Sequence, residues 1–265
     1  MKKIFTLFCA LITFSSFAQQ VKVPVDTTVV TNHSVTIKGK NINYSAQTGM
    51  QPVWDDQGNP IASLYYTYYK RSDIKNTENR PLVISFNGGP GSASVWMHIA
   101  YTGPRILKID DEGYPVQPYG IKENPYSILD VADIVYVNPV NTGYSRPIPD
   151  ADGKVDKSKF FGVNQDISYL AEWLNTFVTR ENRWLSPKYL IGESYGTTRV
   201  SGLALELQNS QWMYLNGVIL VSPTELGIDR EGPVEIANRL PYFAATAWYH
   251  QLLPQELQSK SLTDL

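Results

Sequence analysis

The chain has 265 residues, which corresponds to one large domain or two small ones. Its composition, with 43% hydrophobic and 18% charged residues, excludes a disordered chain. Its 23 basic and 25 acidic residues give a net charge of −2, so charge offers no reason to expect nucleic-acid binding. One cysteine and three histidines exclude an internal disulfide framework, and no metal site or cofactor is expected.

The first residues have the pattern of a secretory signal peptide. Lys2 and Lys3 precede the apolar run Ile4 to Phe14, which is too short to span a membrane, and small residues follow at Ser16 and Ala18. We predict residues 1–18 to be a cleaved signal peptide, so the mature protein is secreted or periplasmic. A buried helix or membrane anchor is the alternative. No later segment is apolar enough for a stable membrane span.

The next segment predicts antiparallel strands. Apolar and polar side chains alternate over Val35 to Tyr44, as in a half-buried strand. The turn residues Asp56 to Asn59 follow, and Ile61 to Tyr69 is rich in residues that favour strands. We expect the two segments to form an antiparallel pair.

Short apolar runs and helical patterns then alternate, which predicts a parallel α/β sheet flanked by helices. From Pro223 onward the pattern changes to a helical, aromatic segment at Ile236 to Leu253, and no further strand is expected. The predicted strands are Pro81–Phe86, Ala132–Val137, Tyr189–Ile191 and Gly217–Val221, and the predicted helices between them are Asn164–Arg180 and Val200–Leu207.

The strongest chemical signal is the sequence Gly192-Glu193-Ser194-Tyr195-Gly196, called the elbow below. It lies between a predicted strand and a predicted helix, which is the context of a nucleophile elbow. Such a turn is strained and needs small flanking residues, and it raises the serine hydroxyl above the sheet at a helix N-terminus. We predict Ser194 to be a nucleophile, with a purely structural turn as the alternative.

A second motif, Asn87-Gly88-Gly89-Pro90-Gly91, follows the strand that ends at Phe86 and is called the Gly-rich loop below. Backbone N–H groups in such a loop can bind an oxyanion. A phosphate-binding loop is excluded because no Lys-Ser or Lys-Thr follows and proline removes a donor. The loop therefore predicts half of an oxyanion hole, with the Tyr195 N–H as the other half; a plain tight turn is the alternative.

The two motifs together resemble the serine carboxypeptidases, a family with the α/β-hydrolase fold. Two intermediate segments agree: Val131 to Ser145 is similar to the family's strand and Pro-Val-Gly-x-Gly-[Phe/Tyr]-Ser loop, and Asn124 to Ser127 resembles its Asn-x-x-Ser-Trp stretch. The resemblance covers roughly Pro81 to Pro223, and the signal peptide suggests an exported bacterial branch.

The resemblance implies an acyl-transfer reaction on peptides with a free C-terminus. Ser194 would be the acylating nucleophile, and Gly89 and Tyr195 would donate their N–H groups to the tetrahedral oxyanion. Asn87, Gly88 and Glu193 would bind the C-terminal carboxylate of the substrate. Glu193 can only fulfil this role if the two carboxyl groups share a proton, which fits activity at acidic pH. A solvated elbow residue is the alternative for Glu193.

Three positions depart from the family pattern. The family's tryptophan before Leu-Asn is Ser85, its cysteine after the Gly-rich loop is Ser92, and its second carboxylate-binding glutamate aligns with Tyr101. Because the carboxylate clamp is altered at Tyr101, an esterase or acyltransferase on the same fold is a second hypothesis.

The sequence does not supply an evident catalytic triad. A serine nucleophile needs a general base, and in this fold the acid and then the histidine follow the serine in the chain. Only His250 follows Ser194, and it lies in a predicted helix; His98 precedes the serine, and His33 has no case for catalysis. We therefore expect the Asp and His to be missing from this chain, and a non-catalytic peptide-binding protein is a third hypothesis.

These patterns divide the chain into a signal peptide at 1–18, the N-terminal part of the hydrolase core at 19–222, and the start of a helical cap insertion at 223–265. On this interpretation we expect the chain to be a fragment in which the C-terminal part of the fold is absent. A naturally short chain that cannot turn over efficiently is the alternative. The last strand would then expose an apolar edge.

Overall fold

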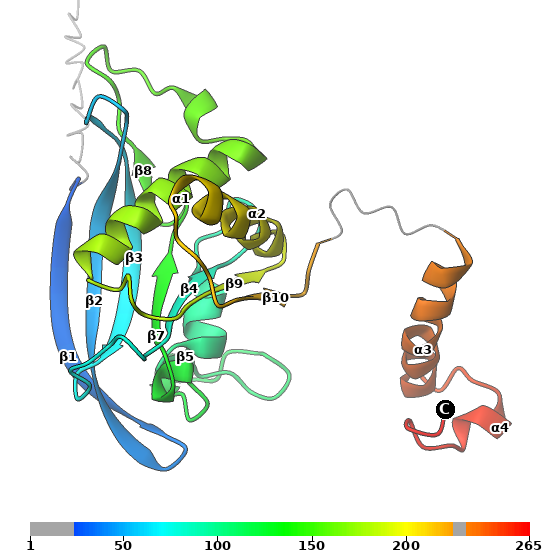
Figure 1. Cartoon of the computed structure of the whole chain (residues 1–265). Helices are drawn as coiled ribbons and strands as arrows, with labels where there is room; N and C mark the ends of the chain where they lie inside the picture. Colours follow the sequence, from blue (N-terminus) through cyan, green and yellow to red (C-terminus); the bar gives the residue numbers. More distant parts are fainter. Residues whose placement is uncertain (1–23, 225–231) are drawn as a thin grey trace, which may run out of the picture.

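The computed structural model describes residues 24–224 and 232–265, so the predicted signal peptide lies outside the described residues. Its main feature is an eight-stranded mixed sheet in the order β1-β2-β3-β7-β4-β9-β10, with β8 paired to β3 (Figure 1). The strands are β1 (Thr27–Ile37), β2 (Lys40–Trp54), β3 (Pro60–Arg71), β4 (Leu82–Phe86), β5 (Arg105–Leu107), β6 (Ile121–Glu123), β7 (Asp133–Val137), β8 (Arg146–Pro147), β9 (Lys188–Glu193) and β10 (Gly217–Val221), of which β5 and β6 form a separate hairpin.

Within the described residues the helical elements are four α-helices, one π-helical segment and two 3₁₀ helices. The predicted strands and helices of the α/β part are all present, and β4, β7, β9 and β10 pair in parallel as expected. The helical elements are η1 (Met97–Thr102), η2 (Ile128–Asp130), η3 (Lys157–Lys159), α1 (Val163–Arg180), α2 (Tyr195–Ser210), α3 (Pro233–Tyr249) and α4 (Gln255–Gln258).

The prediction of a single strand over Val35 to Tyr44 is wrong. A two-residue hairpin turn at Lys38 and Gly39 separates β1 from β2, with Ile37 paired to Lys40. Both turn residues have positive φ, 48° and 76°, as this tight turn requires. The predicted antiparallel pairing with Ile61–Tyr69 holds for β2 and β3.

The main core lies between the sheet and α1 and α2, which pack side by side on one face (Figure 1). Alternate strand residues such as Ile84 and Leu190 point into this core, because successive side chains of a strand face opposite sides. Their neighbours Val83 and Ile191 point to the other face, where Met97 of η1 packs on them. The carboxyl ends of β4 and β9 thus emerge at one edge, between two packed layers.

The last strand and the last helices are more exposed. Val218, Ile219 and Leu220 of β10 are 37–48% exposed, which matches the apolar surface expected on this strand. α3 buries none of its residues. It ends at Tyr249 instead of Leu253, because Gln251 takes a positive φ of 56° and Pro254 follows.

Candidate active site

Ser194 stands alone between β9 and α2, in the conformation of a nucleophile elbow. Its φ of 57° and ψ of −126° are strained for a residue with a side chain. Neighbouring bonds hold this conformation: the Ser194 N–H donates to the Val221 carbonyl at 2.9 Å. The Ser194 carbonyl accepts from the N–H of Thr197 at 2.9 Å and from its hydroxyl at 2.7 Å. The surrounding fold therefore holds the strained serine in place.

The glycines of the elbow are needed because backbones approach closely there. A Cβ at Gly192 would lie 2.1 Å from the Gly196 carbonyl oxygen. A Cβ at Gly196 would lie 3.0 Å from the carbonyl oxygen of Phe86, the last residue of β4. The spacing of the motif thus follows from the contact of the first turn of α2 with β9 and β4.

The Gly-rich loop packs directly against the elbow. A Cβ at Gly88 would lie 2.6 Å from the backbone nitrogen of Tyr195 and 2.8 Å from the carbonyl oxygen of Glu193. Gly89 has a φ of 112°, which favours glycine. Tyr195 opens α2, so its N–H lies in the helix turn that has no internal acceptor. Neither the Gly89 nor the Tyr195 N–H has an acceptor among the residues that the structure describes.

Asn87 links the Gly-rich loop to Glu193. Its Nδ2 donates to Glu193 Oε2 at 3.0 Å, and its Oδ1 accepts from the Met97 N–H at 3.0 Å. The Asn87 N–H donates to Ser94 Oγ at 3.3 Å. Because an amide nitrogen carries two hydrogens, one Nδ2 hydrogen remains for a ligand beside Glu193. The side chain is buried and fixed at both ends, so it is preorganised to hold such a ligand.

The structure therefore brings together all six residues predicted for the site, at the carboxyl ends of β4 and β9. Ser194, Tyr195 and Glu193 come from the elbow, and the other three come from the Gly-rich loop. Their assigned roles stay predictions, because proximity does not establish what they bind.

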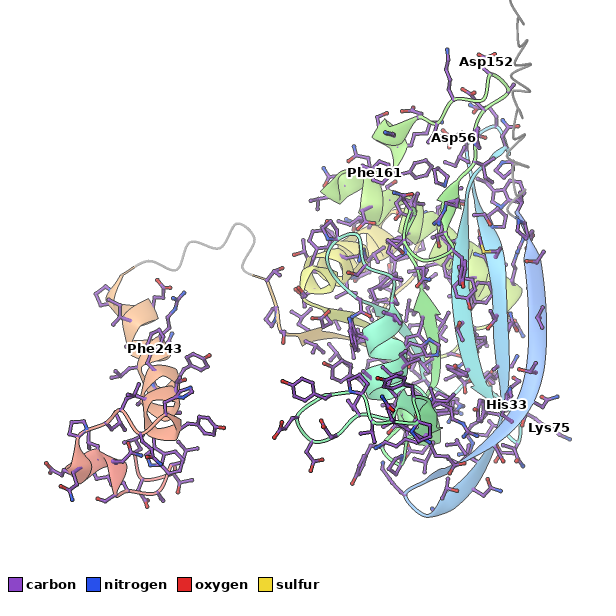
Figure 2. The ribbon with its side chains drawn as sticks, turned by 180° about the vertical axis from the view of Figure 1, so that it is seen from behind. His33, Asp56, Lys75, Asp152, Phe161 and Phe243 are labelled. Carbon is purple, nitrogen blue, oxygen red and sulfur yellow. The ribbon has the colours of Figure 1, made fainter. Side chains whose placement is uncertain are left out.

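None of the three histidines is hydrogen-bonded to Ser194 within residues 24–224 and 232–265. His98 Nε2 pairs with the Tyr69 hydroxyl at 2.6 Å, and its ring stacks on Tyr136. Burial lowers the pKa of His98 to about 4. His33 is hydrogen-bonded to Thr31 in β1, and it lies at the opposite end of the sheet-containing part of the molecule from Phe161 (Figure 2).

A cavity of about 290 Å³ lies beside the Gly-rich loop, and sequence reasoning missed it. Pro90 of the loop and Tyr195 of the elbow form part of its wall. The aromatic residues Phe160, Phe161 and Tyr169 also line it, and Phe161 lies just before the start of α1 (Figure 2). The cavity offers an apolar surface next to the predicted nucleophile.

Sequence reasoning also missed a buried ion pair next to this cavity. Arg199 of α2 pairs with Asp166 of α1 at 2.7 Å between Nε and Oδ2. A signal was present, since Arg199 precedes Leu203 and Leu207 at four-residue spacing on the face of α2 that is buried. A charged residue in a buried stripe indicates a specific partner.

The three departures from the family pattern lie in different environments. Ser85 is buried on β4, and its hydroxyl has no hydrogen-bond partner among the described residues. Ser92 is exposed just after the Gly-rich loop. Tyr101 lies on η1 with 58% of its surface exposed. The described part of the chain contains no group of three or more metal-ligating side chains and no helix suited to crossing a membrane.

The mixed sheet, its parallel centre and the serine elbow define an α/β-hydrolase-like protein. A solved prohormone-processing carboxypeptidase from Saccharomyces cerevisiae has a similar fold, with a TM-score of 0.54 and 18% identity over 81% of this chain and 49% of that one. The pattern that defines the serine carboxypeptidase family matches residues 38–262. The chain therefore belongs to the serine carboxypeptidase family, and the match extends beyond the segment Pro81 to Pro223 on which the resemblance was based.

Curated relatives agree with this assignment. The chain is 30% identical over 171 residues to serine carboxypeptidase-like 36 of Arabidopsis thaliana, which covers 63% of the chain and 33% of that protein. It is 27% identical over 144 residues to a pheromone-processing carboxypeptidase of Saccharomyces cerevisiae, covering 53% of the chain and 18% of that protein. The chain thus spans about a third or less of the length of these two relatives.

Proposed function

We propose that the protein is a serine-type carboxypeptidase that acts on peptides with a free C-terminus. The observation that carries this proposal is the contact between the strained Ser194 and the Gly-rich loop, where Gly88 leaves no room for a Cβ beside Tyr195. Two N–H groups that have no acceptor among the described residues, together with a serine hydroxyl beside them, are the elements of acyl transfer.

In the proposed reaction, Ser194 Oγ attacks the last peptide carbonyl and forms a tetrahedral intermediate. The N–H groups of Gly89 and Tyr195 bind its oxyanion, whose negative charge the N-terminus of α2 also favours. The intermediate collapses to an acyl-enzyme and releases the C-terminal amino acid, and water then hydrolyses the ester. The proton of Ser194 passes to a general base and from there to the nitrogen of the departing amino acid. Within the described residues no histidine is hydrogen-bonded to Ser194.

The free C-terminus is proposed to bind between Asn87 and Glu193. The remaining Nδ2 hydrogen of Asn87 donates to one carboxylate oxygen, and Glu193 shares a proton with the other. Hydrogen bonds to a charged group contribute about 1.5–3 kcal/mol each, so loss of the carboxylate weakens binding roughly 10- to 100-fold.

The test compares a peptide that has a free C-terminus with the same peptide amidated. We expect the chain to bind the free peptide at least tenfold more tightly by calorimetry, and mass spectrometry to show loss of one C-terminal residue. Ser194→Ala is expected to abolish this loss while binding stays within about twofold. Equal binding of the two peptides would exclude the exopeptidase.

Two observations favour other functions of the same site. Tyr101 aligns with the second carboxylate-binding glutamate of the family, which favours an esterase or acyltransferase. Such an enzyme would cleave an ester substrate, and it would bind the amidated peptide as well as the peptide with a free C-terminus. The absence of a histidine bonded to Ser194 among the described residues favours a peptide-binding protein. That protein would bind the free peptide and leave it uncleaved, and Ser194 would not react with a fluorophosphonate.

A further inference from the structure

Arg199 donates hydrogen bonds to the Gly-rich loop as well as to Asp166. The residue is only 1% exposed, on the first turns of α2. One terminal nitrogen donates to the Asn87 carbonyl at 2.8 Å, and the other donates to the Pro90 carbonyl at 3.1 Å. These two carbonyls flank the pair Gly88-Gly89, so the planar guanidinium bridges the two ends of the loop segment that holds the predicted oxyanion donor.

Asp166 fixes the guanidinium from the other side. Its Oδ2 accepts from Arg199 Nε at 2.7 Å, and its Oδ1 accepts from the Tyr169 hydroxyl at 2.9 Å. The Tyr169 oxygen in turn accepts from the Val140 N–H at 3.0 Å. Burial raises the pKa of Tyr169, so the hydroxyl stays protonated and remains a donor. The network therefore connects α1, α2 and the loop after β7 to the Gly-rich loop.

The aromatic ring of Tyr195 lies against the same guanidinium. The Arg199 Cζ is 5.2 Å from the centroid of the Tyr195 ring, within the range of a cation–π contact. Arg199 thus contacts both sides of the predicted oxyanion hole. On one side it binds the Asn87 and Pro90 carbonyls, which flank Gly88-Gly89, and on the other it lies against the ring of Tyr195.

A glycine-rich loop needs such support, because glycine is the most flexible residue in an unsupported backbone. An oxyanion hole functions only when its donors are held close to the position of the developing charge. A displacement of about 1 Å in such a site can cost roughly 100-fold in rate.

We propose that Arg199 is a positioning residue, which holds the Gly-rich loop in the conformation that presents the Gly89 N–H beside Tyr195. Its effect on catalysis rests on the proposed function, whereas its effect on the loop does not. The competing interpretation is a buried ion pair that only stabilises the packing of α1 on α2.

The test uses Arg199→Lys and the double variant Arg199→Met with Asp166→Asn. Lysine keeps the charge beside Asp166 but has a single ammonium that cannot bridge both carbonyls. The double variant removes both charges together, so neither is left buried without a partner, and asparagine still accepts from Tyr169. Arg180→Lys, in an exposed pair with Asp26, is the matched control.

The first measurement is amide hydrogen exchange at Asn87 and Ser92. The Asn87 N–H donates to Ser94 Oγ, and the Ser92 N–H donates to the Gly88 carbonyl. We expect exchange at these amides to rise at least tenfold in both variants, with exchange in α1 and β9 and the unfolding midpoint close to wild type. Unchanged exchange at both amides, or an equal rise throughout the protein, would overturn the proposal.

The second measurement is peptide cleavage by the same proteins. We expect kcat to fall 10- to 100-fold in Arg199→Lys with KM within about twofold, and no change in Arg180→Lys. A wild-type kcat in Arg199→Lys would overturn the positioning role. If the wild-type chain cleaves no peptide, the proposed function fails, and the exchange measurement alone decides whether Arg199 holds the loop.

Discussion

Two buried networks of aspartate and arginine lie at opposite ends of the parallel strands. Asp133 opens β7, where its Oδ1 pairs with Arg80 at 2.7 Å and its Oδ2 with Arg183 at 2.6 Å. Asp166 and Arg199 pair at the other end, beyond the carboxyl ends of β4 and β9. All of these arginines are at least nine-tenths buried.

The difference between the networks lies in what the arginines contact besides aspartate. Arg183 donates to the Arg80 carbonyl at 2.8 Å and to the Tyr68 hydroxyl at 2.5 Å, and so connects β3, β7 and the segment before β4. Arg199 instead donates to carbonyls of the Gly-rich loop. The same chemistry therefore stabilises the sheet at one end and supports the candidate site at the other.

The largest expected effect is at Asp133. Asp133→Ala leaves Arg80 and Arg183 buried without their carboxylate, which costs about 3–5 kcal/mol in free energy of unfolding. Urea unfolding measures the loss. The control is Asp26→Ala, whose exposed pair with Arg180 contributes less than about 1 kcal/mol. Equal effects of the two substitutions would contradict the role given to the Asp133 network.

His98 is half-buried and differs from both aspartates because it has no ion pair among the described residues. Burial lowers its pKa to about 4, so the folded protein keeps the imidazole neutral, against the rings of Tyr69 and Tyr136. The unfolded chain binds a proton near pH 6.5, and stability therefore falls as the pH drops from about 6.5 toward 4.

The expected loss at His98 is up to about 2 kcal/mol between pH 7.5 and pH 5. Other groups titrate in the same range. The measurement is therefore the difference in free energy of unfolding between wild type and His98→Gln, obtained from urea unfolding at pH 7.5 and at pH 5. Glutamine carries no titrating proton, and we expect the stability gap between the two proteins to narrow at pH 5. A gap independent of pH would show that His98 is not held neutral.

Much of the sheet could be predicted from the sequence because buried parallel strands are short continuous apolar runs. The runs at Leu82–Phe86 and Gly217–Val221 became β4 and β10 with little change. The β1–β2 hairpin was missed because the alternation of Val35 to Tyr44 continues across its turn. Lys38 and Gly39 are a less obvious turn signal than an Asn-Gly or Asp-Gly pair.

The candidate site shows the same limit at the level of side chains. The elbow and the Gly-rich loop were predictable because steric requirements at Gly88 and Gly192 leave a local pattern. The contact of Arg199 with Asp166 joins residues on two helices, and no local pattern specifies it. The sequence therefore indicated the position of the predicted nucleophile, and the structure was needed to find which residue contacts the loop beside it.

At Gly88 we expect an effect on stability comparable to that of His98, and a sharp contrast with Gly91 of the same loop. A Cβ there would lie 2.6 Å from the Tyr195 nitrogen, a backbone atom that can move only with α2, whereas a Cβ at Gly91 would meet nothing within 4 Å. We expect Gly88→Ala to cost about 1–3 kcal/mol in urea unfolding by overpacking and to abolish peptide cleavage, while Gly91→Ala changes neither beyond about 0.5 kcal/mol and twofold. If Gly88→Ala kept full cleavage, close contact between the Gly-rich loop and the elbow would not be required, and Arg199 would have no loop position to maintain.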